Sequence, residues 1–414
     1  MISLEAARAL VWRAAAPLGV VSVSRSEALG CVLAVDIVAA EAVPPFANTA
    51  MDGYAVIAND TTHASEQLLV SLRVVDELPA GTAPQRFVGP GEAIRIMTGA
   101  PMPGGADAIV MVERTQRDDP NQSVLISLAV HEGDHVRRAG GDVEAGAVVF
   151  VAGTDLRPAH LGVLASLDVD RVAVVRRPRV GVLSTGDELV ASGPLAPGKI
   201  RDSNRPMLLA MLHEAGCEPV DLGIAPDDEE LIFDRVSHAT LNCDALLTSG
   251  AVSVGDYDFV KVAIERLAHE RGGQYNWQQV AIKPAKPLAF ATVRNGERDV
   301  AIFGLPGNPV SSHVSFEIFA RPVLRSMMGH TEHAQRPVMN CTAASPMTRR
   351  VDGKVHLDRV RVWTDGGQLM CERSGDQASN VLSGMASALG LAVLDDGVGI
   401  ETGGQVAVML LSDF

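Results

Sequence analysis

The stretch Val180-Gly181-Val182-Leu183-Ser184-Thr185-Gly186-Asp187-Glu188 decides how the chain folds. Its apolar half predicts a short buried strand, and its polar half, which contains a glycine, predicts a loop where that strand ends. Downstream, short apolar runs alternate with amphipathic segments. Helices are predicted over 206–215, 228–239 and 259–269, with strands over 217–222 and 245–248 between them. This strict alternation predicts a doubly wound parallel sheet with helices on both faces.

The other segments predict additional domains around this sheet. A strand pair, a further strand over 300–303 and a helix over 309–328 complete the α/β segment, whereas an amphipathic helix over 3–16, with Ser3 as its N-cap, begins the chain. We therefore expect a multidomain α/β protein with a helical and β-rich N-terminal part and a small C-terminal β domain. The predicted parts are an N-terminal helical and linking subdomain (1–52 and 141–176), an inserted β-rich subdomain (53–140), the α/β domain (177–330) and the C-terminal β domain (336–414).

The composition restricts the classes of function. The 35 basic and 50 acidic residues leave a formal net charge of −15, so we expect neither nucleic acid nor an anionic membrane as a partner, since both need a positive face. The five cysteines are scattered without a Cys-x-x-Cys pair, which argues against a disulfide framework and a zinc ribbon. No signal peptide or membrane-spanning stretch is recognisable, and we expect a cytoplasmic protein.

Ligands of an open parallel sheet bind beyond the carboxyl ends of its strands, and one loop predicted there is rich in glycine and serine. It reads Ser249-Gly250-Ala251-Val252-Ser253-Val254-Gly255-Asp256-Tyr257-Asp258. Its backbone N–H groups and hydroxyls can bind a phosphate. The spacing resembles a P-loop, but Asp256 replaces the lysine, so an ordinary nucleoside triphosphatase is disfavoured. Asp256 or Asp258 would suit Mg²⁺, and a capped turn without a ligand is the alternative.

A second strand-end loop, Ile282-Lys283-Pro284-Ala285-Lys286-Pro287, carries two closely spaced cations. Each lysine precedes a proline and is therefore biased towards an extended conformation. In a polyproline II helix, with three residues per turn, Lys283 and Lys286 would point the same way. The loop thus predicts a phosphate clamp, and the alternative is a solvated surface strand.

Other strand-end and N-terminal strings have weaker patterns. Ser184 to Glu188 also fits a capped helix N-terminus, and Asp227 with its acidic neighbour fits ordinary capping. The string Gly304-Leu305-Pro306-Gly307-Asn308-Pro309 predicts a rigid backbone wall without an acid or a base. By chemistry alone, the N-terminal strings around Asp52 and Thr98 would be turns.

The order of these strings resembles one family, the molybdopterin molybdenumtransferases, which include the E domain of gephyrin. Six strings match in order over more than half of the chain. They are Pro45-Phe46-Ala47-Asn48-Thr49-Ala50-Met51-Asp52-Gly53-Tyr54-Ala55, Arg95-Ile96-Met97-Thr98-Gly99-Ala100-Pro101, Ser184-Thr185-Gly186-Asp187-Glu188-Leu189, the loop from Ser249 to Asp258, Ile282 to Pro287, and Gly304 to Pro309.

The resemblance implies four subdomains, the third of them a molybdopterin-binding α/β domain, in a homodimer. Each active site would combine the third subdomain of one chain with the first two of the other, so that Asp52 and Thr98 cross the interface. The implied reaction inserts molybdate into adenylylated molybdopterin and releases AMP in a step that depends on Mg²⁺. Molybdopterin adenylyltransferase and acceptor molybdoenzymes would be further partners.

The resemblance also implies roles for individual residues. The implied catalytic residues are Asp52, Thr98, Glu188, Asp227 and Asp258, and the last three would also bind the metal. The implied substrate-binding residues are Ser249, Gly250, Ser253, Gly255, Lys283, Lys286, Pro306 and Pro309. One departure is Ala251, where the family has a second glycine, so a positive φ there would strain the loop. The rival functions are an adenylyltransferase or pyrophosphatase that uses the α/β domain alone, and a non-catalytic dimeric scaffold.

Overall fold

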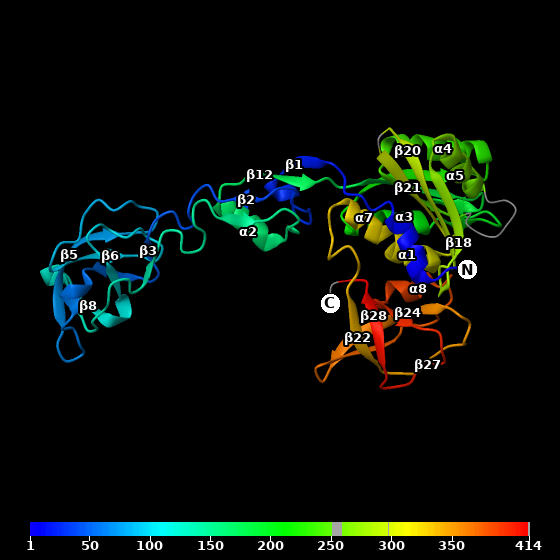
Figure 1. The fold of residues 1–414 in the computed structure, drawn as a ribbon. Helices are drawn as coiled ribbons and strands as arrows, with labels where there is room; N and C mark the ends of the chain where they lie inside the picture. The colour runs from blue at the N-terminus through cyan, green and yellow to red at the C-terminus, as the bar shows by residue number, and fades with distance from the viewer. Residues whose placement is uncertain (251–258, 297, 413–414) are drawn as a thin grey trace. The chain divides into compact units, whose positions relative to one another are not determined.

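The computed structural model describes residues 1–250, 259–296 and 298–412 of the chain. It divides into two compact units (Figure 1). The large unit comprises Met1–Ser22, Gly30–Ala34 and Ala173–Phe414, and the small unit comprises Val23–Leu29 and Val35–Val172. No helix among the described residues is both long and apolar enough to cross a membrane.

A six-stranded sheet forms the centre of the large unit, in the order β16-β13-β17-β21-β20-β18. The first four strands run parallel, as the alternating pattern predicted, but β20 is antiparallel to both of its neighbours. The sheet is therefore mixed rather than wholly parallel. Its strands are β13 (Arg179–Thr185), β16 (Glu218–Ala225), β17 (Ala245–Ser249), β18 (Gln274–Gln279), β20 (Pro287–Asn295) and β21 (Arg298–Leu305).

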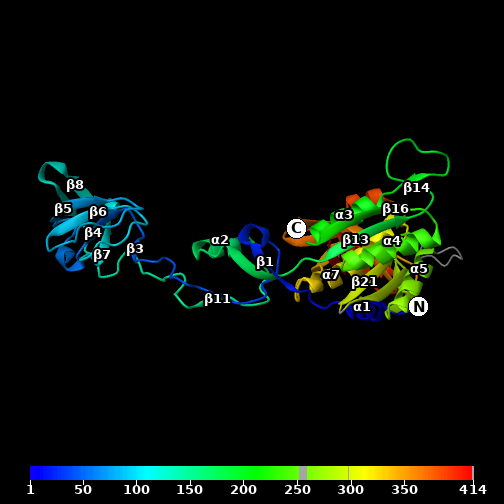
Figure 2. The same cartoon turned by 90° about the horizontal axis from the view of Figure 1, so that it is seen from above.

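Helices cover both faces of this sheet. Successive residues of a strand point to opposite faces, so Val182 of β13 packs in one core with α3 and α6, whereas Leu183 packs in the other with α4 and α5. Helices α4 and α5 lie side by side (Figure 2). The predicted last helix is continuous but contains a π-helical turn, η5. The helices are α3 (Asn204–Glu214), α4 (Glu229–Asn242), α5 (Phe259–Glu270), α6 (Pro309–Ser315), η5 (Phe316–Ala320) and α7 (Arg321–Met327).

The first helix, α1 (Leu4–Trp12), begins at Ser3, whose hydroxyl accepts a hydrogen bond from the Ala6 N–H at 3.2 Å, as predicted for an N-cap. Its apolar face, with Leu4 and Val11, is buried in the same core as α3 and α6. Residues 1–22 thus pack with the large unit, although the sequence grouped 1–52 together. This long-range packing places the chain's start beside the α/β sheet.

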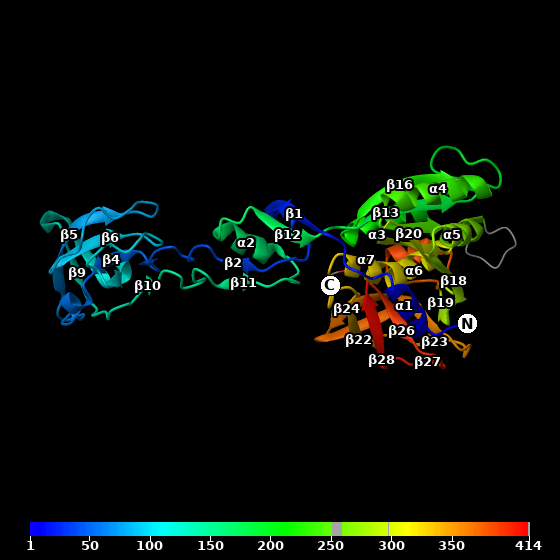
Figure 3. The ribbon, with the colours of Figure 1, turned by 45° about the horizontal axis from the view of Figure 1, so that its top comes forward.

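The C-terminal part of the large unit is a β domain with one short helix, α8 (Leu382–Ala386). Its sheet runs β24-β25-β22-β28-β26, and β26 pairs back to β24, so the sheet closes on itself (Figure 3). The short strand β19 (Ile282–Lys283) joins its edge through β24. The other strands are β22 (Val338–Ala343), β23 (Met347–Thr348), β24 (Val355–Asp365), β25 (Gln368–Arg373), β26 (Gly390–Leu394), β27 (Gly399–Ile400) and β28 (Gln405–Leu410).

The small unit holds the β-rich module that the sequence predicted. Its six-stranded sheet runs β7-β4-β6-β5-β9-β8, with strands β4 (Gly53–Val56), β5 (Val70–Leu78), β6 (Glu92–Ile96), β7 (Ala108–Met111), β8 (Thr115–Asp118) and β9 (Ser123–Ile126). Short elements flank it: β2 (Ile37–Val38), β3 (Asn48–Thr49), β10 (Val136–Arg137), β11 (Val148–Phe150) and α2 (Pro158–Ser166). The chain passes between the units within β1 (Val20–Ser24), on either side of Gly30–Ala34, and within β12 (Arg171–Val175).

Candidate functional site

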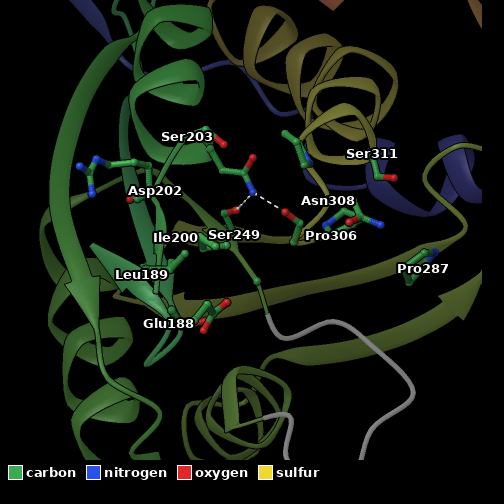
Figure 4. A pocket seen from close by; sticks show the side chains of 16 residues that line it. Glu188, Leu189, Ile200, Asp202, Ser203, Ser249, Pro287, Pro306, Asn308 and Ser311 are labelled. Atoms are coloured by element: carbon green, nitrogen blue, oxygen red, sulfur yellow. Dashed lines mark hydrogen bonds between the residues drawn. The ribbon is translucent and has the colours of Figure 1, made fainter. Parts of the chain in front are cut away.

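A pocket of about 510 Å³ lies at the carboxyl ends of β13, β17 and β21 (Figure 4). This is the position expected for ligands of an open α/β sheet. The segment between β13 and α3, which includes the short strands β14 (Leu189–Val190) and β15 (Ile200–Arg201), forms one wall. Five of the residues named from the sequence line the pocket: Glu188, Ser249, Gly250, Pro306 and Pro309. Four separate strings of the sequence therefore meet at one cavity, the fourth through Pro287 at the end of the loop that carries Lys283 and Lys286.

Gly250 is required by the close approach of two strand ends. Its φ is +105°, and a Cβ there would lie 2.7 Å from the carbonyl oxygen of Thr185 in β13. Its N–H donates a hydrogen bond to the Leu305 carbonyl at 3.3 Å, at the end of β21. Because any side chain would separate these strand ends, only glycine allows the base of the pocket to form.

Asn204, which the sequence analysis missed, connects two of the pocket's loops. Its Nδ2 donates to Ser249 Oγ and to the Gly307 carbonyl, each at 2.7 Å. The sequence predicted that this helix begins at Pro206, which left Asn204 in the connection. The run Asp202-Ser203-Asn204 before a helix is a capping signal that could have drawn attention to it.

Asp202 also lines the pocket, but its charge is already paired. Its Oδ1 accepts from Ser184 Oγ at 3.1 Å, and its Oδ2 accepts from Arg205 Nε at 3.0 Å. Asp202 is buried, and a buried carboxylate needs such partners. Asp202 therefore stabilises the loop that precedes α3. Glu188 is the other carboxylate of the described pocket, and it has no ion-pair partner among the described pocket residues.

The predicted metal-binding residues are only partly brought together. Glu188 lines the pocket, whereas Asp227 does not. Asp227 instead accepts a hydrogen bond from the Asp187 N–H at 3.3 Å, and the Asp187 carboxylate accepts one from the Asp227 N–H at 3.2 Å. This reciprocal pair holds Asp227 beside the loop of Glu188. Among the described residues, no cluster of three or more His, Cys, Asp or Glu side chains could hold a metal ion.

Residues 251–258 of the predicted loop lie outside the described residues. The roles predicted for Ala251, Ser253, Gly255, Asp256 and Asp258 therefore stay predictions.

The lysine loop does not form a polyproline II helix, and that expectation was wrong. Ala285 has a φ of +72°, and β19 pairs in parallel with β24, with Lys283 opposite His356. Both lysines are exposed, and neither lines the pocket, although the neighbouring Pro287 does. The loop is held instead by strands on either side, because the Val355 N–H donates to the Ala281 carbonyl at 2.9 Å.

In the small unit, the structure brings Asp52 and Thr98 together. The Asp52 carboxylate oxygen Oδ1 accepts hydrogen bonds from the Thr98 N–H and from the Thr98 hydroxyl, both at 2.7 Å. The backbone hydrogen bond, and then the hydroxyl, lower the pKa of Asp52, so the carboxylate stays ionised. Both side chains belong to exposed residues.

The fold and the pocket define a multidomain α/β protein with a candidate ligand site at the carboxyl ends of the parallel strands of its sheet. Comparison with known families identifies it further. Residues 2–167 match the MoeA N-terminal region (domain I and II), residues 181–326 match the probable molybdopterin binding domain, and residues 347–411 match the MoeA C-terminal region (domain IV).

Full-length relatives agree with these matches. The molybdopterin molybdenumtransferase of Bacillus subtilis (strain 168) is 36% identical, covering 94% of this chain and 90% of the relative. Molybdopterin molybdenumtransferase 2 of Mycobacterium tuberculosis is 40% identical, with 94% of each covered. The solved molybdopterin biosynthesis moeA protein of Pyrococcus horikoshii OT3 is 28% identical, with a TM-score of 0.81 over 99% of this chain and 100% of that one. The chain belongs to the molybdopterin molybdenumtransferase family, as its sequence motifs indicated.

Proposed function

We propose that the chain inserts molybdate into adenylylated molybdopterin, with release of AMP, to give the molybdenum cofactor. Membership of the family supports a molybdenum transfer to molybdopterin. The observation that carries the proposal is the meeting of four motif strings at one pocket, through Glu188, Gly250, Pro287 and Pro306. The close approach at Gly250 keeps the ends of β13 and β17 together at the base of the pocket, and the proline residues give that wall a fixed shape.

One carboxylate of the described pocket, that of Glu188, suits Mg²⁺. Glu188 offers a carboxylate with no ion pair to any described residue, and Mg²⁺ typically takes one or two carboxylates together with substrate phosphates. Glu188 would hold the ion, and Asp227 and Asp258 are the further candidates. Once bound, Mg²⁺ would offset the repulsion between these carboxylates and the phosphate oxygens. The protein's own part is to hold the substrate at the strand ends and to fix its orientation.

AMP release from adenylylated molybdopterin, measured with and without molybdate, tests this function. We expect release only when molybdate is present. A non-catalytic scaffold would release no AMP in either case. An adenylyltransferase or pyrophosphatase would act on the substrate at the same rate with and without molybdate.

The active site is completed by a second copy of the chain. The hydrogen-bonded pair Asp52 and Thr98 supports this, because both belong to motif strings of the family yet lie in the small unit. Asp52→Ala and Lys283→Ala chains, each of low activity, should regain part of the activity when they are mixed and allowed to exchange subunits. A mixture no more active than either variant alone would contradict the shared site.

The protein acts in the cytoplasm, where molybdopterin adenylyltransferase would supply its substrate and molybdoenzymes would accept its product. Its five cysteines are buried and none of them forms a disulfide, which suits a reducing compartment. Fractionation of cells that produce the chain should place it with cytosolic marker enzymes.

A further inference from the structure

Asn204 is the first residue of α3 and lies between two loops that form the base of the pocket. Its amide donates to the Ser249 hydroxyl and to the Gly307 carbonyl, in the loop that carries Pro306. Figure 4 labels Ser249 and Pro306 in this part of the pocket. Asn204 is 9% exposed, and Ser249 is 2% exposed. The amide therefore links the end of β17 with the loop between β21 and α6.

The chemistry of its partners fixes the orientation of this amide. The Gly307 carbonyl can only accept a hydrogen bond, so the group that faces it must be the NH₂ and not the amide oxygen. The same nitrogen donates its second hydrogen to Ser249 Oγ. Ser249 is consequently an acceptor in this pair, and its own hydroxyl hydrogen points elsewhere.

Among the described residues, the Asn204 amide is the one hydrogen-bond partner of Ser249 Oγ, and it is a donor. The hydroxyl hydrogen of Ser249 therefore has no acceptor among these residues. Ser249 lines the pocket, so a ligand there can supply the missing acceptor. A phosphate oxygen is such an acceptor, and a hydrogen bond to a charged group is stronger than one between neutral groups.

We propose that Asn204 is a positioning residue that holds Ser249 as a hydrogen-bond donor to a phosphate oxygen of the substrate. The inference rests on the proposed function, whose substrate carries phosphate groups. In a chain with a net charge of −15, a neutral donor held in one orientation helps to bind an anion beside Glu188. If the Ser249 hydroxyl could rotate freely, its oxygen lone pairs would face the anion for part of the time and weaken binding.

The isosteric substitution Asn204→Asp reverses the polarity of this contact. The introduced carboxylate faces the Gly307 carbonyl, and Ser249 turns its hydrogen towards the carboxylate instead of the substrate. We expect KM for adenylylated molybdopterin to rise about tenfold to hundredfold, with a smaller change in kcat. Burial raises the pKa of the introduced carboxyl, and its protonated form donates again. The KM difference from wild type should therefore shrink as the pH is lowered.

Ser249→Ala should raise KM by a similar factor. Adding Asn204→Asp to it should cost less than Asn204→Asp does alone, because the shared contact is already lost and only the added charge remains. Asn295→Asp is the matched control: its Nδ2 also donates to a carbonyl, that of Thr240 at 2.9 Å, but Asn295 does not line the pocket. It should lower the thermal midpoint without changing KM.

The inference is overturned if KM in Asn204→Asp and Ser249→Ala stays within twofold of wild type, or if their effects add. Should Asn204→Asp fail to fold, Ser249→Ala decides alone. An inactive wild type would contradict the proposed function instead. In that case, equilibrium dialysis with AMP as a phosphate-bearing probe gives the same comparison without turnover. Weaker AMP binding in both variants supports the inference, and unchanged binding overturns it.

Discussion

Replacing Gly250 with alanine should separate the strand ends at the base of the pocket. The new Cβ would lie 2.7 Å from the Thr185 carbonyl oxygen, a backbone atom in a buried strand that cannot turn away. A φ of +105° adds strain, because holding a residue other than glycine in such a region costs about 1–3 kcal/mol. We expect the free energy of unfolding to fall by at least this amount and KM for adenylylated molybdopterin to rise.

Gly198→Ala is the matched control for this substitution. Gly198 has a φ of +81°, but a Cβ there meets nothing within 4 Å. Urea unfolding of the two variants separates backbone strain, which they share, from the collision with Thr185, which only Gly250→Ala suffers. Steady-state kinetics then report on the pocket. Equal losses of stability, with KM unchanged in both variants, would refute the close approach that we infer at Gly250.

Three further predictions concern charge. Replacing Lys283 or Lys286 with alanine should raise KM about tenfold to hundredfold while the thermal midpoint hardly changes, since both residues are exposed; unchanged KM in both would show that neither binds the substrate. A chelator should abolish AMP release, and Mg²⁺ should restore it; full turnover in excess chelator would exclude the metal. Burial lowers the pKa of His313, so the unfolded chain takes up a proton near pH 6.5 that the folded chain takes up only at lower pH. Stability should thus fall between about pH 7 and 5, and less so in His313→Gln; parallel curves of thermal midpoint against pH would contradict this.

The local patterns of the sequence predicted most of the α/β domain. Apolar runs and amphipathic segments gave β13, β16 and β17 and the helices between them, because their periodicity depends on which face of each element is buried. The direction of β20 was beyond this reasoning. A short apolar run has the same pattern in a parallel and in an antiparallel strand, so its pairing with β21 is decided by tertiary structure.

The candidate site also has features that the local sequence indicates and features that depend on tertiary contacts. The sequence placed Gly250 in a phosphate-binding loop, and that role stays a prediction. Its positive φ gives a structural reason for a glycine at this position. The conformation of the lysine loop was predicted wrongly, because its pairing with β24 involves a strand that begins only at Val355. Asn204 was missed because its role depends on two loops that meet only in the folded chain. Proline and lysine spacing carries no information about such contacts.

The most direct test of the account is the amount of molybdenum incorporated for each AMP released. Purified chain is incubated with adenylylated molybdopterin, Mg²⁺ and molybdate, after which AMP is measured by chromatography and pterin-bound molybdenum by mass spectrometry. The account predicts equal molar amounts of the two, and neither product when Glu188 is replaced by glutamine. Release of AMP without molybdenum in the pterin product would contradict it and make the chain a hydrolase of the adenylylated pterin.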